Sequence, residues 1–290
     1  MKYDFDKIVD RNNTNSFKWG KTKEFLGAGD AIPLWVADMD LECSEKVVQA
    51  IKQRLEHKIF GYSYRPDSFY QAIIDWNKKR FNWIIKKEWI LNTPGVVTAI
   101  SIALQAFSKK DDKILIQPPV YGPFAKVVEL NERKLLKNEL ILRDNRYYID
   151  FADLEEKLAQ GVKIMILCSP HNPVGRVWIK DELRRIGELA EKYNVLIVSD
   201  EIHYDIVLSN VTHYPIAKLS PAFAARAITL TAPSKTFNLA GFKMANIIIS
   251  NDEICKKFKK GINKLHLFNS TTLGVVAEEA AYRYGEEWLD

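Results

Sequence analysis

Lys235 lies in a run of residue types that could carry out covalent chemistry on a cofactor. The run 233–238 reads Pro-Ser-Lys-Thr-Phe-Asn, and Gly241 and Lys243 follow it closely. A lysine amine is a nucleophile only when the site desolvates it or a second cation lies nearby, because its ordinary pKa of about 10.4 keeps it protonated. Lys243 could be that cation. Most of the 42 basic residues of the chain are expected to be solvated, so this hypothesis depends on the rest of the site.

Three further polar clusters contain residue types that such chemistry needs. They are the runs 92–97 (Asn-Thr-Pro-Gly-Val-Val), 169–175 (Ser-Pro-His-Asn-Pro-Val-Gly) and 199–203 (Ser-Asp-Glu-Ile-His). Taken singly, Asp200 could cap a helix, Asn172 could belong to a turn, and His203 could be a buried core histidine.

Together with Lys235, the clusters match the needs of a pyridine-aldehyde phosphate. Such a cofactor requires a lysine for its aldehyde, a carboxylate for its ring nitrogen, donors for its phenolate oxygen, an aromatic face and an anion cradle. Gly95 precedes an expected helix, whose first N–H groups and dipole favour a phosphate. The sequence therefore predicts a pyridoxal 5'-phosphate site.

Other cofactor classes lack their motifs. The run 20–22 (Gly-Lys-Thr) resembles the end of a P-loop, but Asn15 stands where that motif requires a glycine. The run 27–29 (Gly-Ala-Gly) lacks the third glycine of a dinucleotide site, and neither H-E-x-x-H nor G-x-S-x-G occurs. We expect no metal site.

The composition is that of an ordinary globular protein. The 290 residues, 47% of them apolar, predict one large domain and part of a second. A net charge of +5 is too small to indicate nucleic-acid binding. That alternative rests only on the basic run 256–264, which has the pattern of a helix with a solvated face.

The amino terminus and the cysteines predict a cytoplasmic protein. The run 1–6 is acidic and lacks the apolar stretch of a secretory signal, and no later run is long enough to span a membrane. Cys43, Cys168 and Cys255 stand far apart without a CxxC pair, which predicts neither disulfides nor a zinc site.

Short apolar runs alternate with helical patterns from residue 44 onward. Buried strands are expected at 113–116, 163–168, 195–198, 227–231 and 246–249. This alternation predicts a three-layer α/β/α fold with a mainly parallel sheet, which binds ligands beyond the carboxyl ends of its strands. Residues 1–45 lack the pattern and are expected to form an N-terminal arm and part of a small domain, whereas residues 46–290 form the large domain.

Three helices have patterns clear enough to predict which side chains face inward. One begins after Ser44, one after Gly95, and one covers 181–193. For the first helix the inward residues are Val47, Val48, Ile51 and Leu55. For the second they are Val96, Val97, Ile100, Leu104 and Phe107, and for the third they are Leu183, Ile186, Ala190 and Tyr193.

The combined motifs resemble those of the class I/II aminotransferases, which are fold-type I pyridoxal-phosphate enzymes. The matching runs are 171–176 (His-Asn-Pro-Val-Gly-Arg), 199–203 and 234–241 (Ser-Lys-Thr-Phe-Asn-Leu-Ala-Gly). A subgroup is indicated by 35–40 (Trp-Val-Ala-Asp-Met-Asp), 60–62 (Phe-Gly-Tyr) and 117–124 (Gln-Pro-Pro-Val-Tyr-Gly-Pro-Phe). These runs resemble the carbon-sulfur β-lyases of the cystathionine β-lyase (MalY/PatB) type, and the similarity extends from about residue 3 to residue 290.

The resemblance implies a role for each residue around the cofactor ring. Lys235 would bind the aldehyde and then transfer protons, and Asp200 would pair with the pyridine nitrogen. Asn172 would donate to the phenolate oxygen. His203 stands where many relatives have tyrosine and would be a second donor, while Tyr121 would stack on the ring.

The resemblance also implies how the phosphate is held. The N–H groups of Val96 and Val97 would bind it together with Ser234 and Lys243. Many relatives have arginine at the position of Lys243, and lysine keeps the charge but lacks the bidentate fork. Tyr62 resembles a tyrosine that reaches the phosphate of the neighbouring subunit, which implies a homodimer with shared active sites.

The implied activity is the elimination of a thiol from cystathionine or another cysteine S-conjugate, which yields pyruvate and ammonia. Relatives continue beyond the helix that contains 277–284 into a segment bearing the arginine for the substrate's α-carboxylate. We therefore expect a complete cofactor site, an incomplete substrate site and impaired turnover. Two alternatives use the same cofactor: an aminotransferase, and a non-catalytic cofactor-binding or regulatory protein.

Overall fold

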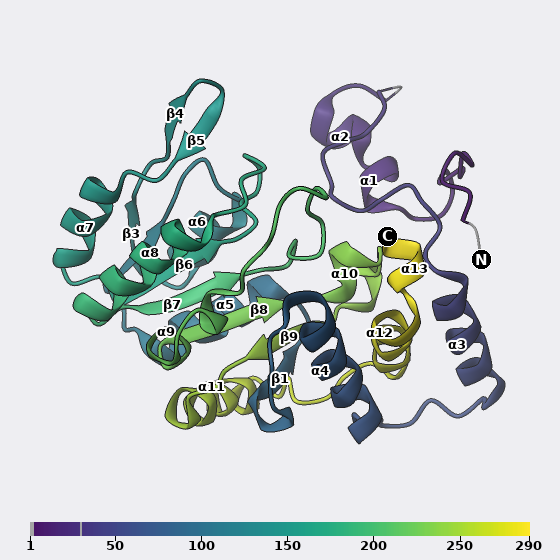
Figure 1. The fold of residues 1–290 in the computed structure, drawn as a ribbon. Coiled ribbons are helices and arrows are strands. Elements are labelled where there is room, and N and C mark those ends of the chain that lie inside the picture. Colours follow the sequence, from purple (N-terminus) through teal and green to yellow (C-terminus); the bar gives the residue numbers. More distant parts are fainter. Residues whose placement is uncertain (1–2, 30) are drawn as a thin grey trace.

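A computed structural model describes residues 3–29 and 31–290. Residues 1, 2 and 30 lie outside the described part, and with them the first two positions of the acidic amino terminus and one position of the expected arm. Figure 1 shows a twisted sheet with helices on both sides, and the amino-terminal segment lying beyond one end of it.

The main sheet has seven strands in the order β1-β9-β8-β7-β6-β2-β3. Their bounds are Ile90–Thr93 (β1), Lys113–Ile116 (β2), Lys134–Lys137 (β3), Ile164–Cys168 (β6), Leu196–Asp200 (β7), Ala227–Thr231 (β8) and Ala245–Ile248 (β9). Only β9 runs antiparallel to its neighbours, β8 and β1. The mainly parallel sheet predicted from the sequence is therefore confirmed.

The direction of β9 brings one more segment to the edge where the other strands end. Because β9 is antiparallel, its first residue lies opposite the last residues of β8 and β1: Ala245 pairs with Thr93, and Asn246 pairs with Thr231. Lys243, two residues before β9, therefore lies at the same edge as the residues that follow β6, β7 and β8.

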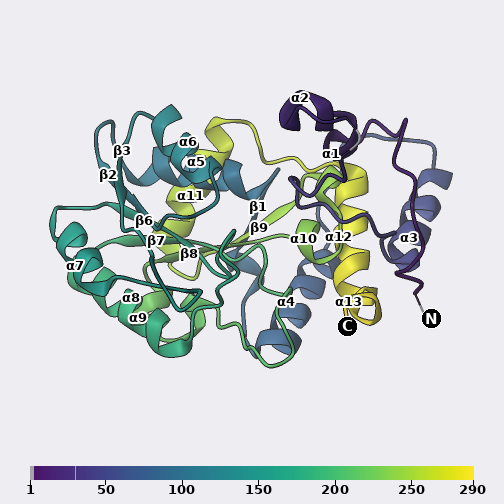
Figure 2. The ribbon, with the colours of Figure 1, turned by 90° about the horizontal axis from the view of Figure 1, so that it is seen from above.

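Helices cover both faces of the sheet, as Figure 2 shows from above. One face is covered by α5 (Val96–Phe107), α6 (Pro123–Leu130) and α11 (Asp252–Lys264), and the other by α7 (Phe151–Ala159), α8 (Lys180–Lys192) and α9 (Pro221–Ala224). In α8, Leu183, Ile186 and Ala190 are completely buried, as the helical spacing predicted. In α11, Phe258 and Ile262 face the core while the lysines are exposed, so the basic run is a solvated helix face.

A third helical group packs beside the β1 end of the sheet. It consists of α3 (Glu45–Glu56), α4 (Asp67–Phe81), α12 (Thr272–Tyr284) and α13 (Glu286–Leu289). Its core is aromatic: Trp76 lies 5.3 Å from Phe237 and 5.6 Å from Tyr282, measured between ring centroids. Phe237 directly follows α10 (Pro233–Thr236), the turn that carries Lys235.

Residues 3–45 are mostly irregular, as predicted, but contain two short helices, α1 (Phe17–Gly20) and α2 (Thr22–Leu26). Ion pairs hold this segment together, since Arg11 pairs with Asp38 and with Asp40. Asn238 attaches it to the large domain, because its amide accepts from the N–H of Met39 and donates to the Met39 carbonyl. These hydrogen bonds attach the arm to the large domain at Asn238, three residues after Lys235.

Two predictions of inward-facing residues are wrong. Leu55, near the end of α3, is 42% exposed, because the last turn of this helix extends past the core. Val97 is 36% exposed, because the first turn of α5 lies at a pocket. Ser44 precedes α3 as predicted, but its hydroxyl bonds that of Tyr3 at 3.1 Å and does not cap the helix.

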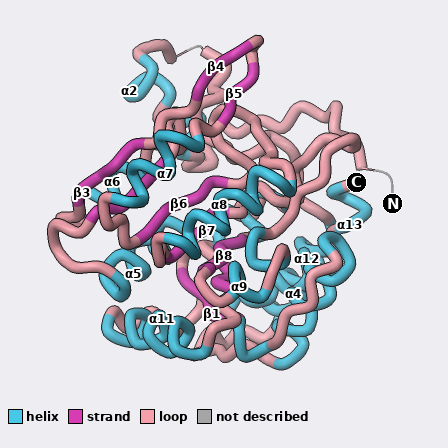
Figure 3. The backbone as a smooth tube through the Cα atoms, turned by 60° about the vertical axis from the view of Figure 1, so that its left-hand side comes forward, coloured by secondary structure: helices cyan, strands magenta, loops and turns pink. Residues whose placement is uncertain are grey.

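Some short elements were not predicted. They are β1, β3, the single-turn elements η1 (Lys87–Trp89), η2 (Ile216–Lys218) and η3 (Ala240–Phe242), and the hairpin of β4 (Ile141–Arg143) and β5 (Arg146–Tyr148). Figure 3 shows that this hairpin stands apart from the main sheet.

Candidate active site

A pocket of about 780 Å³ lies at the carboxyl edge of the sheet, between β6, β7, β8 and the amino-terminal arm. The arm contributes apolar residues to the wall, namely Phe17, Leu34, Trp35, Val36 and Ala37. The sheet side contributes the predicted polar residues. The pocket therefore lies where a fold of this type is expected to bind a ligand.

Lys235 projects into the pocket from α10, directly after β8. Its Nζ donates a hydrogen bond of 2.7 Å to the carbonyl oxygen of Ala37. Burial lowers the pKa of the Lys235 amine, whereas Asp38 and Asp200 raise it. The lysine is thus partly desolvated, as a nucleophilic amine requires.

Asp200 ends β7 and is only 5% exposed. Its Oδ1 accepts from the N–H of Ile202 at 3.1 Å, and no ion pair joins it to a residue of the described ranges. Burial raises the pKa of this carboxyl to about 7. A buried carboxylate without a cation is costly, so the protonated nitrogen of a pyridine ring would fit here as the missing partner.

Asn172 and His203 lie beside this carboxylate, in the loops after β6 and β7. The Asn172 N–H contacts the sulfur of Cys168 at 3.4 Å, which holds the loop against the end of β6. Burial, helped by the charge of Lys235, lowers the pKa of His203 to about 4. The imidazole is therefore neutral at pH 7 and can donate one N–H and accept at its other nitrogen.

The turn before α5 provides an anion cradle in the same pocket. Gly95 precedes the helix with a φ of +148°, a conformation that favours glycine. The hydroxyl of Thr93 donates to the Gly95 carbonyl at 2.9 Å and steadies the turn. Val96 and Val97 begin the 12-residue helix, so their N–H groups have no partner within it.

Ser234, Lys243 and Tyr121 complete the polar lining of the pocket. Lys243 directly follows η3 and has a left-handed conformation with a φ of +55°. Tyr121 precedes α6 and is 40% exposed. Its ring and that of Phe124 form a T-shaped pair with 5.8 Å between the ring centroids. The Tyr121 side chain is thus partly exposed at the pocket.

The structure brings nine of the ten predicted residues into this one pocket: Val96, Val97, Tyr121, Asn172, Asp200, His203, Ser234, Lys235 and Lys243. Tyr62 lies elsewhere and is 99% exposed. Its predicted role concerns a second subunit and stays a prediction.

The arm side of the pocket was not predicted as part of the site. In the sequence the run 35–40 indicates only the subgroup, yet Ala37 provides the carbonyl that accepts the hydrogen bond of Lys235. Ile202, Ala232 and Met244 also line the pocket and carry no chemical signal in the sequence.

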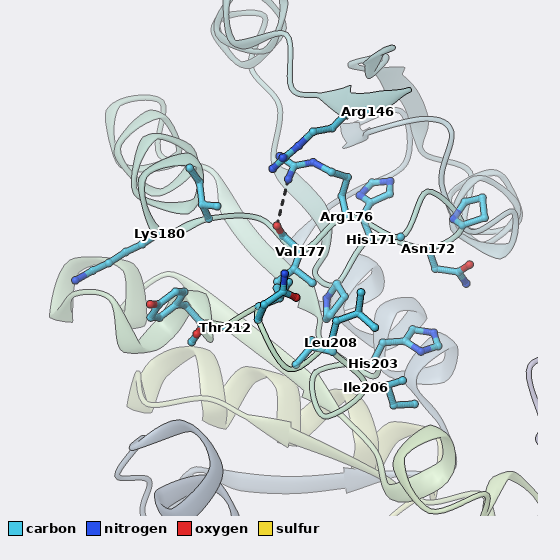
Figure 4. A pocket seen from close by; sticks show the side chains of 18 of the residues that line it. Arg146, His171, Asn172, Arg176, Val177, Lys180, His203, Ile206, Leu208 and Thr212 are labelled. Carbon is cyan, nitrogen blue, oxygen red and sulfur yellow. Dashed lines mark hydrogen bonds between the residues drawn. The ribbon is translucent and has the colours of Figure 1, made fainter. Parts of the chain in front are cut away.

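A second pocket, of about 800 Å³, adjoins the first and shares Asn172, Pro173 and His203 with it. Figure 4 shows Arg146 and Arg176 at its far end. Arg176 is already bonded, since it donates to the Tyr147 carbonyl at 2.8 Å and to Glu182 at 2.5 Å.

Residues 30–287 match the family model described as aminotransferase class I and II, and the chain belongs to this family. It is 45% identical to the cystathionine β-lyase PatB of Bacillus subtilis (strain 168) over 287 residues, which cover 99% of this chain and 74% of that protein. Within the family the chain belongs to the carbon-sulfur lyase subgroup of MalY/PatB type.

Two solved structures are similar over nearly the whole chain. The crystal structure of a PLP-bound putative aminotransferase from Clostridium difficile 630 has a TM-score of 0.97 and 43% sequence identity, and the match covers 99% of this chain and 74% of that one. The structure of cystalysin from Treponema denticola, which contains pyridoxal 5'-phosphate, has a TM-score of 0.96 and 38% sequence identity. The match covers 100% of this chain and 74% of that one. The cofactor of the family is therefore pyridoxal 5'-phosphate, and the buried Asp200, the desolvated Lys235 and the Gly95 turn fit it.

No helix in residues 3–29 and 31–290 combines the length and the apolar character of a membrane span. Within the same ranges, no group of histidine, cysteine and acidic side chains is arranged to hold a metal ion.

Proposed function

We propose that the protein is a pyridoxal-phosphate-dependent carbon-sulfur β-lyase. Its substrates would be cystathionine or other cysteine S-conjugates, and its products a thiol, pyruvate and ammonia. The observation that carries the proposal is the meeting of Lys235 and Asp200 in one pocket, in a chain that is 45% identical to a cystathionine β-lyase.

Lys235 and Asp200 would divide the proton chemistry between them. When bound, the cofactor's pyridine ring withdraws electrons from the substrate's α-carbon and makes its proton acidic. Asp200 would keep a proton on the ring nitrogen, which also gives this buried carboxylate its missing partner. Lys235 Nζ would hold the aldehyde of the resting cofactor and, once free, remove the α-proton. The lowered pKa of the Lys235 amine supports the second role.

The remaining lining residues would hold and orient the cofactor. Asn172 and His203 would donate to the ring oxygen. Tyr121 would stack its ring on one face of the cofactor ring. The N–H groups of Val96 and Val97, together with Ser234 and Lys243, would bind the phosphate.

We assign residues 46–290 to a large cofactor-binding domain and residues 1–45 to an arm that forms part of a smaller one. We propose a homodimer in which Tyr62 of one subunit reaches the partner's phosphate, as the resemblance of the run 60–62 implies. A reducing cytoplasm suits the three cysteines, which carry free thiols.

The proposal is tested by product analysis of the purified protein loaded with pyridoxal phosphate. With cystathionine and no added keto acid, we expect pyruvate and a free thiol to form in equal amounts. Lys235→Ala should abolish both products, and borohydride reduction should leave the cofactor covalently attached only to the protein that has the lysine.

An aminotransferase is the second candidate, because the similar structure from Clostridium difficile carries that description. Strict dependence of turnover on a keto acid would favour it over the lyase. A visible band without turnover of any sulfur amino acid would instead favour a non-catalytic cofactor-binding protein.

A further inference from the structure

Asp205 is a buried carboxylate that lies outside the pocket. It follows Asp200 by five residues and His203 by two. Its side chain is completely shielded from solvent. Acidic side chains are rarely buried unless they are paired, so its partners indicate why it is there.

Three side chains bond or neutralise this carboxylate. The hydroxyl of Thr236 donates to Oδ2 at 2.8 Å. The indole N–H of Trp76 lies 3.2 Å from both carboxylate oxygens. The Nε of Arg80 lies 3.8 Å from Oδ1, and its guanidinium stacks on the Trp76 ring.

These contacts join the two segments that carry the proposed chemistry. Asp205 belongs to the loop that begins with Asp200 and His203, and Thr236 is the neighbour of Lys235. Trp76 and Arg80 belong to α4. This helix contacts both segments, because Trp76 bonds Asp205 and its ring packs against Phe237. A single buried carboxylate thus connects the lysine turn, the loop after β7 and a supporting helix.

The lysine turn needs such support. α10 has only four residues, and an isolated helix of this length does not hold its conformation, because nucleation costs more than one turn returns. Its stability must come from tertiary contacts. Thr236 and Phe237 provide them, since both are completely buried and Phe237 packs against Trp76.

We infer that Asp205 is a positioning residue that acts through Thr236. It sets where Lys235 stands relative to Asp200 and His203. This inference rests on the proposed role of Lys235 as the cofactor-binding and proton-transferring amine. The position matters because a misplacement of about 1 Å can cost on the order of a hundredfold in rate.

A purely structural role for the same contacts makes a different prediction. Loss of a buried hydrogen bond would then lower the melting temperature and leave the chemistry of the folded protein unchanged. A positioning role predicts a change in the pH titration of the visible cofactor band, because that titration reports the surroundings of the lysine nitrogen.

The test uses the full chain loaded with pyridoxal phosphate and compares three variants with the wild type. Thr236→Val removes the hydroxyl and keeps the shape, while Thr236→Ser keeps the hydroxyl. Glu278→Gln is the matched control, because Glu278 is also buried but bonds Asn246 and not Asp205, Thr236 or Lys235. Burial raises the pKa of Glu278 to about 8, so this carboxyl is mostly neutral at pH 7 and glutamine imitates it.

For Thr236→Val we expect kcat to fall about ten- to a hundredfold with KM changed less than about threefold. The midpoint of the band's pH titration should move by about half a unit or more. Thr236→Ser should restore both values, and Glu278→Gln should resemble the wild type in both.

A Thr236→Val protein with wild-type kcat and titration midpoint would overturn the inference, whatever its melting temperature. If that variant does not fold, Trp76→Phe decides, since it removes another donor to Asp205 and keeps an aromatic ring. Its titration midpoint should move from the wild-type value by about half a unit or more, and an unmoved midpoint would also overturn the inference. Failure of the proposed function looks different, because the wild type itself would then lack the band or the elimination.

Discussion

Asp200 shows how a residue suited to cofactor chemistry can destabilise the protein that carries it. Burial raises the pKa of its carboxyl to about 7 from an ordinary value of 3.8. Between these two pH values the folded, cofactor-free chain holds a proton that the unfolded chain has released. The stability that the folded chain gains from holding this proton is therefore fully present at low pH and is lost as the pH rises from about 4 to about 7.

Asp200→Asn should remove this loss, because an amide stays neutral at every pH. Without cofactor, we expect the variant to melt about 5 to 10 °C above the wild type at pH 8, with a smaller difference at pH 5. Differential scanning calorimetry at the two pH values measures both differences. Added pyridoxal phosphate should stabilise the wild type more than the variant. A difference in melting temperature that does not change with pH would contradict this account.

His203 gives a second prediction at the residue scale. Its imidazole is neutral at pH 7, since burial lowers its pKa to about 4, so its proposed role is that of a neutral hydrogen-bond donor. His203→Tyr keeps a donor, and we expect kcat/KM within about fivefold of the wild type. His203→Phe keeps the ring without a donor and should lose about ten- to a hundredfold. Steady-state kinetics with cystathionine compares the two, and equal losses would rule out a donor role.

Polar side chains next to buried strands could be recognised from the sequence as candidate site residues. Contacts that involve backbone groups, or segments far apart in the chain, could not. Lys235, Asp200 and Asn172 follow buried strands and carry distinctive side chains. The partner of Lys235 is the Ala37 carbonyl, 198 residues away, and every residue type has a carbonyl. The bond from Thr236 to Asp205 likewise depends on how three segments pack, which spacing alone does not reveal.

At the scale of elements, the turn before α5 depends on the backbone freedom of Gly95. A side chain at that position would meet no atom within 4 Å, so the φ of +148° is the reason for glycine there. Gly95→Ala should shift the turn and misdirect the first N–H groups of α5. We expect the dissociation constant for pyridoxal phosphate to rise about tenfold, for a strain of about 1 to 2 kcal/mol.

Gly122→Ala is the control for this variant. Gly122 precedes α6 with helical angles, a φ of −51° and a ψ of −39°, and it too has open space around it. An added methyl group should therefore leave cofactor affinity unchanged. Titration of the cofactor-free proteins by absorbance gives both constants. Equal affinities in the two variants would show that the Gly95 conformation does not shape the cradle.

Strong apolar runs predicted the central strands, and weak ones at the sheet's edges were missed. β6 and β8 are buried at every position, which leaves a continuous apolar signal. β3 reads Lys-Leu-Leu-Lys with both lysines exposed, because one of its sides has no neighbouring strand. The antiparallel direction of β9 leaves no mark in its composition, although it determines which segment brings Lys243 to the site.

At the scale of the whole molecule, an exposed aromatic segment follows α3. Ile59, Phe60, Tyr62 and Tyr64 are 58% to 99% exposed. Side chains of this kind are enriched at interfaces between subunits. The segment therefore suits the homodimer that we propose, in which Tyr62 would serve the active site of the partner.

A complementation experiment tests this shared site. Tyr62→Phe should weaken phosphate binding because the tyrosine hydroxyl is lost, and Lys235→Ala should be inactive. In a mixed dimer, one of the two sites would combine an intact lysine from one subunit with an intact tyrosine from the other. We expect co-refolded equimolar variants to regain about a quarter of the wild-type activity, since half of random pairs are mixed and each restores one site of two. Analytical ultracentrifugation establishes that dimers form, and a mixture no more active than the average of its components would place Tyr62 outside the partner's site.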